Sequence, residues 1–135
     1  MATTTTLTKS VVTLIAAATS NTAGSTTRGT ADLRTSLGGL LTIKIINGAT
    51  GPTVQAQANI LVAHNTGATP TAASAGTDWK TVYQVGNGTA NNMVGEWSYV
   101  VPPGVMHIEV EVTGNTAQAV TCEAFLSRVD SSSSA

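Results

Sequence analysis

Three ionisable side chains occupy alternate positions late in the chain: His107, Glu109 and Glu111. Alternate residues of an extended strand point to the same face, about 7 Å apart, so these side chains are expected to lie together. Two carboxylates beside an imidazole could hold a metal ion or carry out general acid and base catalysis. Groups along a single strand do not converge on one point, however, unless neighbouring strands add partners. The favoured interpretation is therefore a solvated strand face without a metal site.

The other candidates for chemistry stand alone in the sequence. Cys122 is the single cysteine, so no disulfide can form within the chain, and it is predicted to be a small buried hydrophobic residue. His64 begins a glycine-rich segment and is interpreted as a polar loop residue. Phosphate-binding loops, zinc-ligand spacings and nucleophile elbows are absent from the sequence. We therefore expect a protein that is not an enzyme, with no catalytic residues and no cofactor.

Four of the five aromatic residues lie in two short segments, with Trp79 and Tyr83 in one and Trp97 and Tyr99 in the other. If neighbouring strands bring them together, they could form an exposed platform that stacks on sugar rings. A chain with one Phe and many Ala residues needs its few large side chains inside, so the core or a subunit interface is the favoured position. The glycosylation pattern that begins at Asn87 is interpreted as a turn.

Short segments rich in Val, Ile and Thr follow one another and are separated by Gly, Asn and Pro. Apolar residues recur at every second position in the two clearest segments, 54–62 and 105–113, which is the pattern of a half-buried strand. Dipeptides such as Asn47-Gly48 end the segments, because these residues favour turn conformations. Strands are predicted at residues 11–17, 31–35, 40–46, 54–62, 79–85, 96–101, 105–113 and 120–129.

Seven or eight short strands without a helical period indicate an all-β fold. We predict a single-domain antiparallel β-sandwich, either jelly-roll or immunoglobulin-like. The residues predicted to share its core are Val54, Ile60, Ile108, Val110 and Val112. The longer aperiodic segment at residues 64–78 is expected to be a binding loop or an interface loop.

The length of 135 residues fits one domain with one core. We divide the chain into a Thr-rich N-terminal arm with one strand (1–30), the β-sandwich (31–129) and a polar C-terminal tail (130–135). Within its own domain the arm has too little apolar surface to offset the entropy of ordering it. We therefore expect a neighbouring molecule to order the arm by strand addition.

Charged residues make up 10% of the chain and the net charge is -1. This balance provides no basic patch, so no nucleic acid partner is expected, and low net charge favours association between copies. The apolar run at residues 11–18 is far shorter than the roughly 20 residues that span a bilayer, so no membrane partner is expected. Together with Lys9 this run loosely imitates a signal peptide, which stays open as the alternative to the favoured β-strand.

Four segments in order along the chain, 28–34, 38–52, 99–104 and 106–114, resemble small virion structural proteins of tailed bacteriophages. The likeness lies in the general residue pattern of these segments, such as Tyr-Val-Val-Pro-Pro-Gly at 99–104, and not in an invariant motif. It implies a β-sandwich that decorates or cements the capsid, with the major capsid protein and further copies of itself as partners. It also implies a place on the capsid surface of the virion after assembly in the host cytoplasm. Other such proteins serve as head-to-tail connectors or in the tail or fibres, and the resemblance leaves these places open.

A carbohydrate-binding module or adhesin is the alternative function, with residues 64–78 and the aromatic residues recognising a glycan. Buried Trp79 and Trp97 would favour the structural role, whereas a coplanar exposed pair would favour glycan binding. An enzyme would require the acidic and histidine residues of the 105–113 strand to meet a partner in a cleft.

Overall fold

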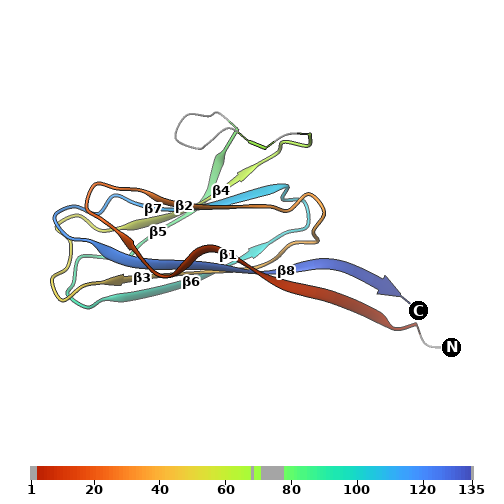
Figure 1. Ribbon diagram of the computed structural model, residues 1–135, viewed down its shortest axis with the longest axis horizontal. Coiled ribbons are helices and arrows are strands. Elements are labelled where there is room, and N and C mark those ends of the chain that lie inside the picture. Colours follow the sequence, from red (N-terminus) through yellow and green to blue (C-terminus); the bar gives the residue numbers. More distant parts are fainter. Residues whose placement is uncertain (1–2, 68, 71–77, 135) are drawn as a thin grey trace.

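The computed structural model describes residues 3–67, 69–70 and 78–134, which form eight β-strands and no helix (Figure 1). Accordingly, the described residues contain no helix that could cross a membrane. The strands are β1 (Thr5–Asn21), β2 (Thr27–Asp32), β3 (Gly39–Asn47), β4 (Gln57–Ala63), β5 (Lys80–Gly86), β6 (Val94–Val101), β7 (His107–Thr113) and β8 (Val120–Ser134). The predicted all-β fold is confirmed.

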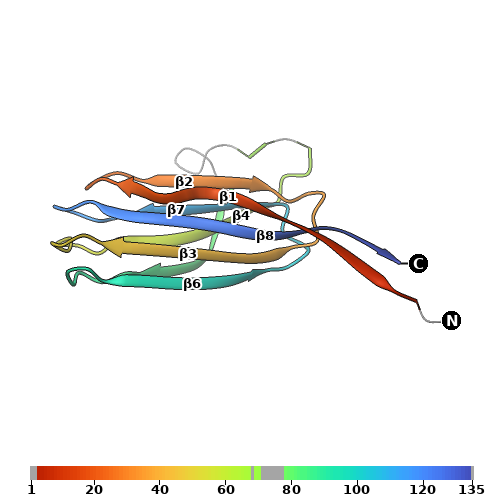
Figure 2. The same ribbon diagram turned by 60° about the horizontal axis from the view of Figure 1, so that its bottom comes forward.

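The strands pair like a long hairpin that has been rolled up. β1 pairs with β8, β2 with β7, β3 with β6 and β4 with β5, and every pair is antiparallel. Two further pairs, β3 with β8 and β4 with β7, join them into two sheets. Sheet A has the order β1-β8-β3-β6 and sheet B the order β2-β7-β4-β5, and the two sheets form the layers seen in Figures 1 and 2. This nested order is that of a jelly roll, one of the two predicted topologies.

The core lies between the sheets and is built from alternate residues of the strands. Of the five predicted core residues, Ile60, Ile108, Val110 and Val112 are at most 1% exposed, which confirms the period-two interpretation of these strands. Fully burying an aliphatic side chain of this size stabilises the fold by about 1.5–3 kcal/mol. The remaining members of the buried apolar cluster are Leu14, Ile15, Leu33, Leu41, Ile43, Ile45, Ala56, Ala58, Val101, Val120, Cys122, Ala124 and Leu126.

The prediction for Val54 was wrong, because this side chain is 52% exposed. β4 begins only at Gln57, and the residues before it run beside the loop that precedes β8. There the backbone amide of Val54 donates a hydrogen bond to Thr116 Oγ1 over 3.0 Å. The alternating pattern thus begins before the strand does, and of its two residues there Ala56 is buried whereas Val54 is exposed.

β1 is longer than the 11–17 strand expected from the sequence and belongs to the sandwich. It pairs with β8, and its residues Leu14 and Ile15 are buried in the core. Gly29 of β2 packs directly against it, because a Cβ at this position would collide with the carbonyl oxygen of Leu14. Much of β1 is therefore held by its own chain, whereas we expected a neighbouring molecule to order residues 1–30. The Thr- and Ala-rich sequence supplies two large aliphatic side chains where β1 crosses the core.

The outer ends of β1 and β8 form a two-stranded ribbon that projects beyond the other strands (Figures 1 and 2). We call residues 5–9 and 129–134 the terminal ribbon. β3 pairs with β8 only as far as Arg128, so within the described chain the ribbon has two strands. Residues 130–134, which we expected to form a polar tail, therefore continue β8. Their Ser residues need no core for this, because the ladder itself satisfies the backbone hydrogen-bonding groups.

Buried asparagines tie the loops together at the end of the sandwich opposite the ribbon. Asn21 Nδ2 donates to Asn115 Oδ1 over 2.7 Å, and Asn115 Nδ2 donates to the carbonyl oxygen of Asn21 over 3.1 Å. Asn87 Nδ2 likewise donates to Asn47 Oδ1 over 2.9 Å. All four residues are at most 1% exposed, so the glycosylation pattern at Asn87 is buried in the fold. The sequence indicated turns near three of these residues, but it contained no signal for their pairing across the chain.

Replacing Asn115 with Ala should lower the free energy of unfolding by about 1–3 kcal/mol, because the variant leaves buried polar groups of Asn21 without partners. Urea denaturation followed by tryptophan fluorescence measures the change. Gln118→Ala in the same loop is the matched control, since this side chain is exposed, and we expect a change below about 0.5 kcal/mol. Equal losses in the two variants would contradict the role given to the buried amides.

Candidate functional site

Part of the outer face of sheet B is covered, although the sequence predicted a solvated face there. His107 and Glu109 of β7 are only 4% and 2% exposed. The chain after β4 lies over this face, because the carbonyl oxygen of Asn65 is 3.1 Å from His107 Nε2 and Pro70 is buried. The prediction was wrong because strand alternation determines the face on which a side chain lies, but not what covers that face.

A row of polar side chains crosses all four strands of sheet B on this face. Asn59 Nδ2 donates to Glu111 Oε1 over 2.8 Å, and Gln84 Nε2 donates to Asn59 Oδ1 over 2.8 Å. On the other side Arg28 forms an ion pair and a hydrogen bond with Glu111 Oε2. Both oxygens of Glu111 therefore have partners within the sheet, which gives this carboxylate a structural role.

Glu109 lies one step along β7 and is less well compensated. Its Oε2 is 3.5 Å from Arg28 Nη1, and it accepts no hydrogen bond from any residue that the structure describes. Burial raises the pKa of this carboxyl above its ordinary value, the charge of Glu111 raises it further, and Arg28 opposes both effects. The side chain is thus a buried acceptor with unused hydrogen-bonding capacity.

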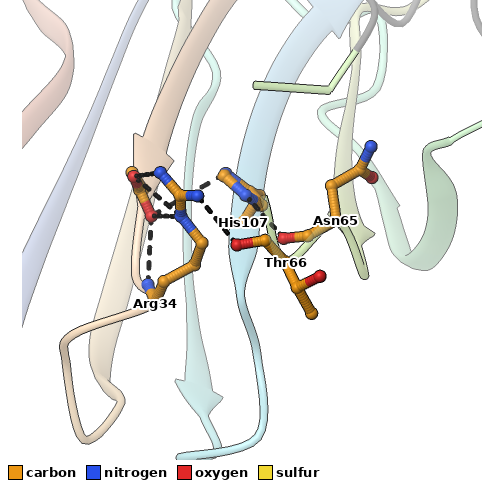
Figure 3. A network of polar contacts seen from close by, with 5 residues as sticks. Arg34, Asn65, Thr66 and His107 are labelled. Carbon is orange, nitrogen blue, oxygen red and sulfur yellow. Dashed lines mark hydrogen bonds and ion pairs between the residues drawn. The ribbon is translucent and has the colours of Figure 1, made fainter. Parts of the chain in front are cut away.

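A second polar network fixes the segment after β4 to the sheet (Figure 3). Arg34 Nε and Nη2 donate to the carboxylate of Asp32 over 3.0 and 2.7 Å, and Arg34 Nη1 donates to the carbonyl oxygen of Thr66 over 2.9 Å. These hydrogen bonds hold the pKa of Asp32 well below its ordinary value. His107 Nδ1 lies 3.9 Å from Asp32 Oδ1. The acidic and histidine residues of β7 therefore meet partners from β2 and the loops on either side.

Between these networks lies a cavity of about 300 Å³. Its described lining contains both polar and apolar residues. The lining residues are Thr30, Ala31, Asp32, Thr69, Pro70, Trp79, His107 and Glu109. The sequence singled out the two residues of β7 and the indole but not Asp32, since only the register of β2 against β7 places Asp32 opposite His107.

The aromatic residues do not form a shared platform. Trp97 and Tyr99 lie on β6 and pack against the core, as the favoured interpretation required, although both are only partly buried. The rings of Tyr83 on β5 and Tyr99 lie 5.9 Å apart and are tilted by 31°, which joins the edge strands of the two sheets. Trp79 is also partly buried and lines the cavity on sheet B instead. No coplanar pair of Trp79 and Trp97 is present.

The outer face of sheet A is exposed, and two of its rows, between Lys9 on the ribbon side and Lys44 on the other, carry no charge. The register places two rows of four side chains side by side across β1, β8, β3 and β6. The rows, which we call the uncharged face, are Val11, Ser127, Leu40 and Val100, followed by Thr13, Phe125, Thr42 and Ser98. Val11, Leu40 and Val100 are 67%, 44% and 74% exposed. This sheet thus presents large apolar side chains to solvent.

The charged groups of the sheet begin in the next row. There Lys44 Nζ lies 3.5 Å from Glu96 Oε1, and Glu123 is the neighbour of Lys44 on β8. A hollow of about 440 Å³ lies where this charged row meets the uncharged face, and Lys44, Glu96 and Glu123 are part of its lining. Its lining includes Thr42, Phe125 and Trp97. The surface therefore changes from apolar to charged across a depression.

Comparison with known proteins shows the fold alone. No protein-family model matches the chain, and no curated protein sequence matches it. The K2 cleaved adhesin domain of Lys-gingipain, a protein of Porphyromonas gingivalis, is similar at a TM-score of 0.51 and 10% identity, over 93% of this chain and 87% of that one. The chain spans 63% of the K3 adhesin domain of the same protein.

Two structures of viral or phage origin are similar at lower scores. The SPBc2 prophage-derived protein YomS has a TM-score of 0.45 and 17% identity, over 90% of this chain and 95% of that one. A structure of infectious bursal disease virus, Gx strain, is similar at a TM-score of 0.49 and 12% identity, over 90% of this chain and 32% of that one. At these identities the neighbours establish no function for this chain.

The buried carboxyl of Glu109 should give stability a distinct pH dependence. Its pKa is raised above 4.5 in the folded protein, so just above this pH the folded protein keeps a proton that the unfolded chain has lost. Stability therefore falls as the pH rises through this window. Relative to a Glu109→Gln variant, the wild-type free energy of unfolding should decrease from pH 4.5 to neutral pH, as measured by urea denaturation. If the difference in free energy of unfolding between wild type and Glu109→Gln does not change with pH, the raised pKa of Glu109 is contradicted.

Proposed function

We propose that this chain is a non-enzymatic structural protein of a phage particle: a capsid decoration protein that bridges neighbouring major capsid subunits and cements the shell. The uncharged face carries the proposal. Val11, Leu40 and Val100 lie exposed in one row of this sheet. Exposed apolar patches of this kind mark surfaces that bind protein. Covering this face removes no ionised group from water, so its desolvation costs little.

The terminal ribbon supports the same proposal. A two-stranded ribbon alone is marginally stable in water, and residues 5–9 and 131–134 are exposed. Its backbone edges can accept a further strand from a neighbouring protein. The ribbon adjoins the uncharged face, because Val11 and Ser127 lie next to it on β1 and β8. One continuous surface of the protein is therefore suited to contact a capsid.

Weak contacts of this type suffice on a repeating lattice. Each copy that touches the major capsid protein and another copy of itself gains from a high effective concentration, so modest contacts add up to a firm shell. Because these contacts involve few charges, higher salt should weaken them little. The sequence resemblance to small virion proteins supports a place on the virion, which this proposal takes to be the capsid surface.

A platform-type carbohydrate-binding module or adhesin is the alternative, and a connector, tail or fibre protein is a further one. The aromatic residues give the platform little support, since Trp97 and Tyr99 pack against the core and Trp79 lies by the other sheet. Quantitative mass spectrometry and immunogold electron microscopy of the native particle test the location. A cement protein is expected in many copies over the shell, and shells stripped of it should open at lower temperature until it is added back. A few copies at the tail or portal, with unchanged shell stability, would overturn the cement role.

Val100→Asp should weaken binding to stripped shells on the order of tenfold or more, because the new carboxylate must leave water when the uncharged face is covered. Co-sedimentation with the shells measures the affinity. Val54→Asp is the matched control, since Val54 is also more than half exposed but lies outside both sheets. Unchanged binding of Val100→Asp, or equal losses in both variants, would show that the uncharged face is not the contact surface.

A chain that lacks residues 1–9 should fold, because Leu14 and Ile15 remain to complete the core. Its occupancy on the shell should fall several-fold, because β8 loses its ribbon partner and the edge that a neighbour would extend. Circular dichroism follows the folding, and mass spectrometry of the reconstituted shells gives the occupancy. Full occupancy by the truncated chain would exclude the ribbon from the contact.

A further inference from the structure

The cavity on sheet B has the lining of a binding site for a small molecule. Its volume of about 300 Å³ lies at the small end of ligand pockets in proteins. The apolar side chains of the lining are those of Pro70 and Trp79, whereas Ala31 faces the core and borders the cavity with its backbone. The polar side chains of the lining include those of Thr30 and Glu109. A ligand that fits this cavity must be small, with an apolar surface and a polar edge.

Glu109 is the group that points to a ligand. A carboxylate that is 2% exposed normally has its oxygens hydrogen-bonded, because an unmade bond in the interior is costly. Oε2 of Glu109 has only the ion pair with Arg28 at 3.5 Å and no hydrogen bond from the described residues. Glu111, its neighbour on β7, has both oxygens hydrogen-bonded within the same sheet. The missing partner of Glu109 is a hydrogen-bond donor.

The charges around the cavity favour a neutral donor. Both acidic residues in the lining have a cation nearby, Arg28 for Glu109 and Arg34 for Asp32, so a cationic ligand would meet no unmatched negative charge. The described lining contains no Lys or Arg that would attract an anion. The described residues also contain no group of three acidic, histidine or cysteine side chains that could hold a metal ion. Neutral hydroxyl groups satisfy these conditions.

We propose that this cavity binds one neutral saccharide residue. The C–H face of the sugar ring packs against Trp79, and a ring hydroxyl donates a hydrogen bond to the carboxylate of Glu109. Thr30 adds a hydroxyl that can donate or accept at the same edge. The site is on the opposite sheet from the uncharged face, so it adds to the proposed function and does not depend on it.

Titration of the ¹⁵N-labelled protein with methyl glycosides of glucose, galactose, mannose and N-acetylglucosamine, in both anomers, tests the proposal by NMR. At least one glycoside should shift the indole resonance of Trp79 and the amides of Thr30 and Ala31, while the indole of Trp97 stays in place. Trp79→Ala should abolish the shifts. Glu109→Gln should weaken the affinity about tenfold, since the hydroxyl then donates to a neutral amide oxygen and no longer to a charged carboxylate.

Glu123→Gln is the matched control, because it removes a carboxylate from the outer face of sheet A, and it should bind like the wild type. Val100→Asp should also bind the glycoside normally, which separates this site from the proposed capsid contact. No shifts with any glycoside would overturn the proposal, as would equal affinity in wild type and Glu109→Gln. Tetramethylammonium chloride and sodium phosphate are the charged probes, and a shift of the Trp79 indole by either one in place of the glycosides would also overturn it.

Discussion

The pairing of β8 with both β1 and β3 is the constraint on which the rest of the molecule depends. The last strand of the chain lies inside sheet A, so the sheet is incomplete until the chain end returns between the first and third strands. Its inward residues Cys122, Ala124 and Leu126 belong to the core. Its outward residues Phe125 and Ser127 lie in the uncharged face. Beyond the sandwich the same strand forms the terminal ribbon, so one ladder of backbone hydrogen bonds positions the core, the exposed surface and the projection.

The distribution of polar and apolar side chains on the two outer faces is the reverse of what contact with water favours. The outer face of sheet B carries charged side chains, yet the chain after β4 lies over His107, and Arg28, Asn59 and Arg34 compensate the carboxylates. The outer face of sheet A carries Val11 and Val100 exposed to water. Burying carboxylates is tolerated only where cations and amides surround them. Leaving apolar side chains exposed is typical of a surface that another protein covers, which is why the two faces are assigned different roles.

Polar side chains, more than apolar area, fix the loops of this small-residue sandwich. The residues of the buried apolar cluster lie on the strands, except Leu33 and Ala56, so the loops contribute few large side chains to the core. The buried pairs Asn21–Asn115 and Asn47–Asn87 tie the loops at one end, and the contacts of Arg34 with Asp32 and Thr66 tie the segment after β4. In a low-dielectric interior such hydrogen bonds are strong when complete and costly when partly made. Asn87 Oδ1 and Glu109 Oε2 are the buried side-chain atoms of the described residues that have no hydrogen-bond partner, and of these two residues Glu109 lines the cavity.

The sequence by itself determined the fold class and much of the core. The period-two pattern of β4 and β7 and the Gly, Asn and Pro residues between segments were sufficient, because these signals are local in the chain. The absence of catalytic motifs could also be read locally. Tertiary structure alone decided that Val54 is exposed, that β1 and β8 extend into a ribbon, and that His107 and Glu109 are buried beside Asp32 and Trp79. These features depend on strand register and on what covers a face, which join residues far apart in the chain and leave no periodic signal in the sequence.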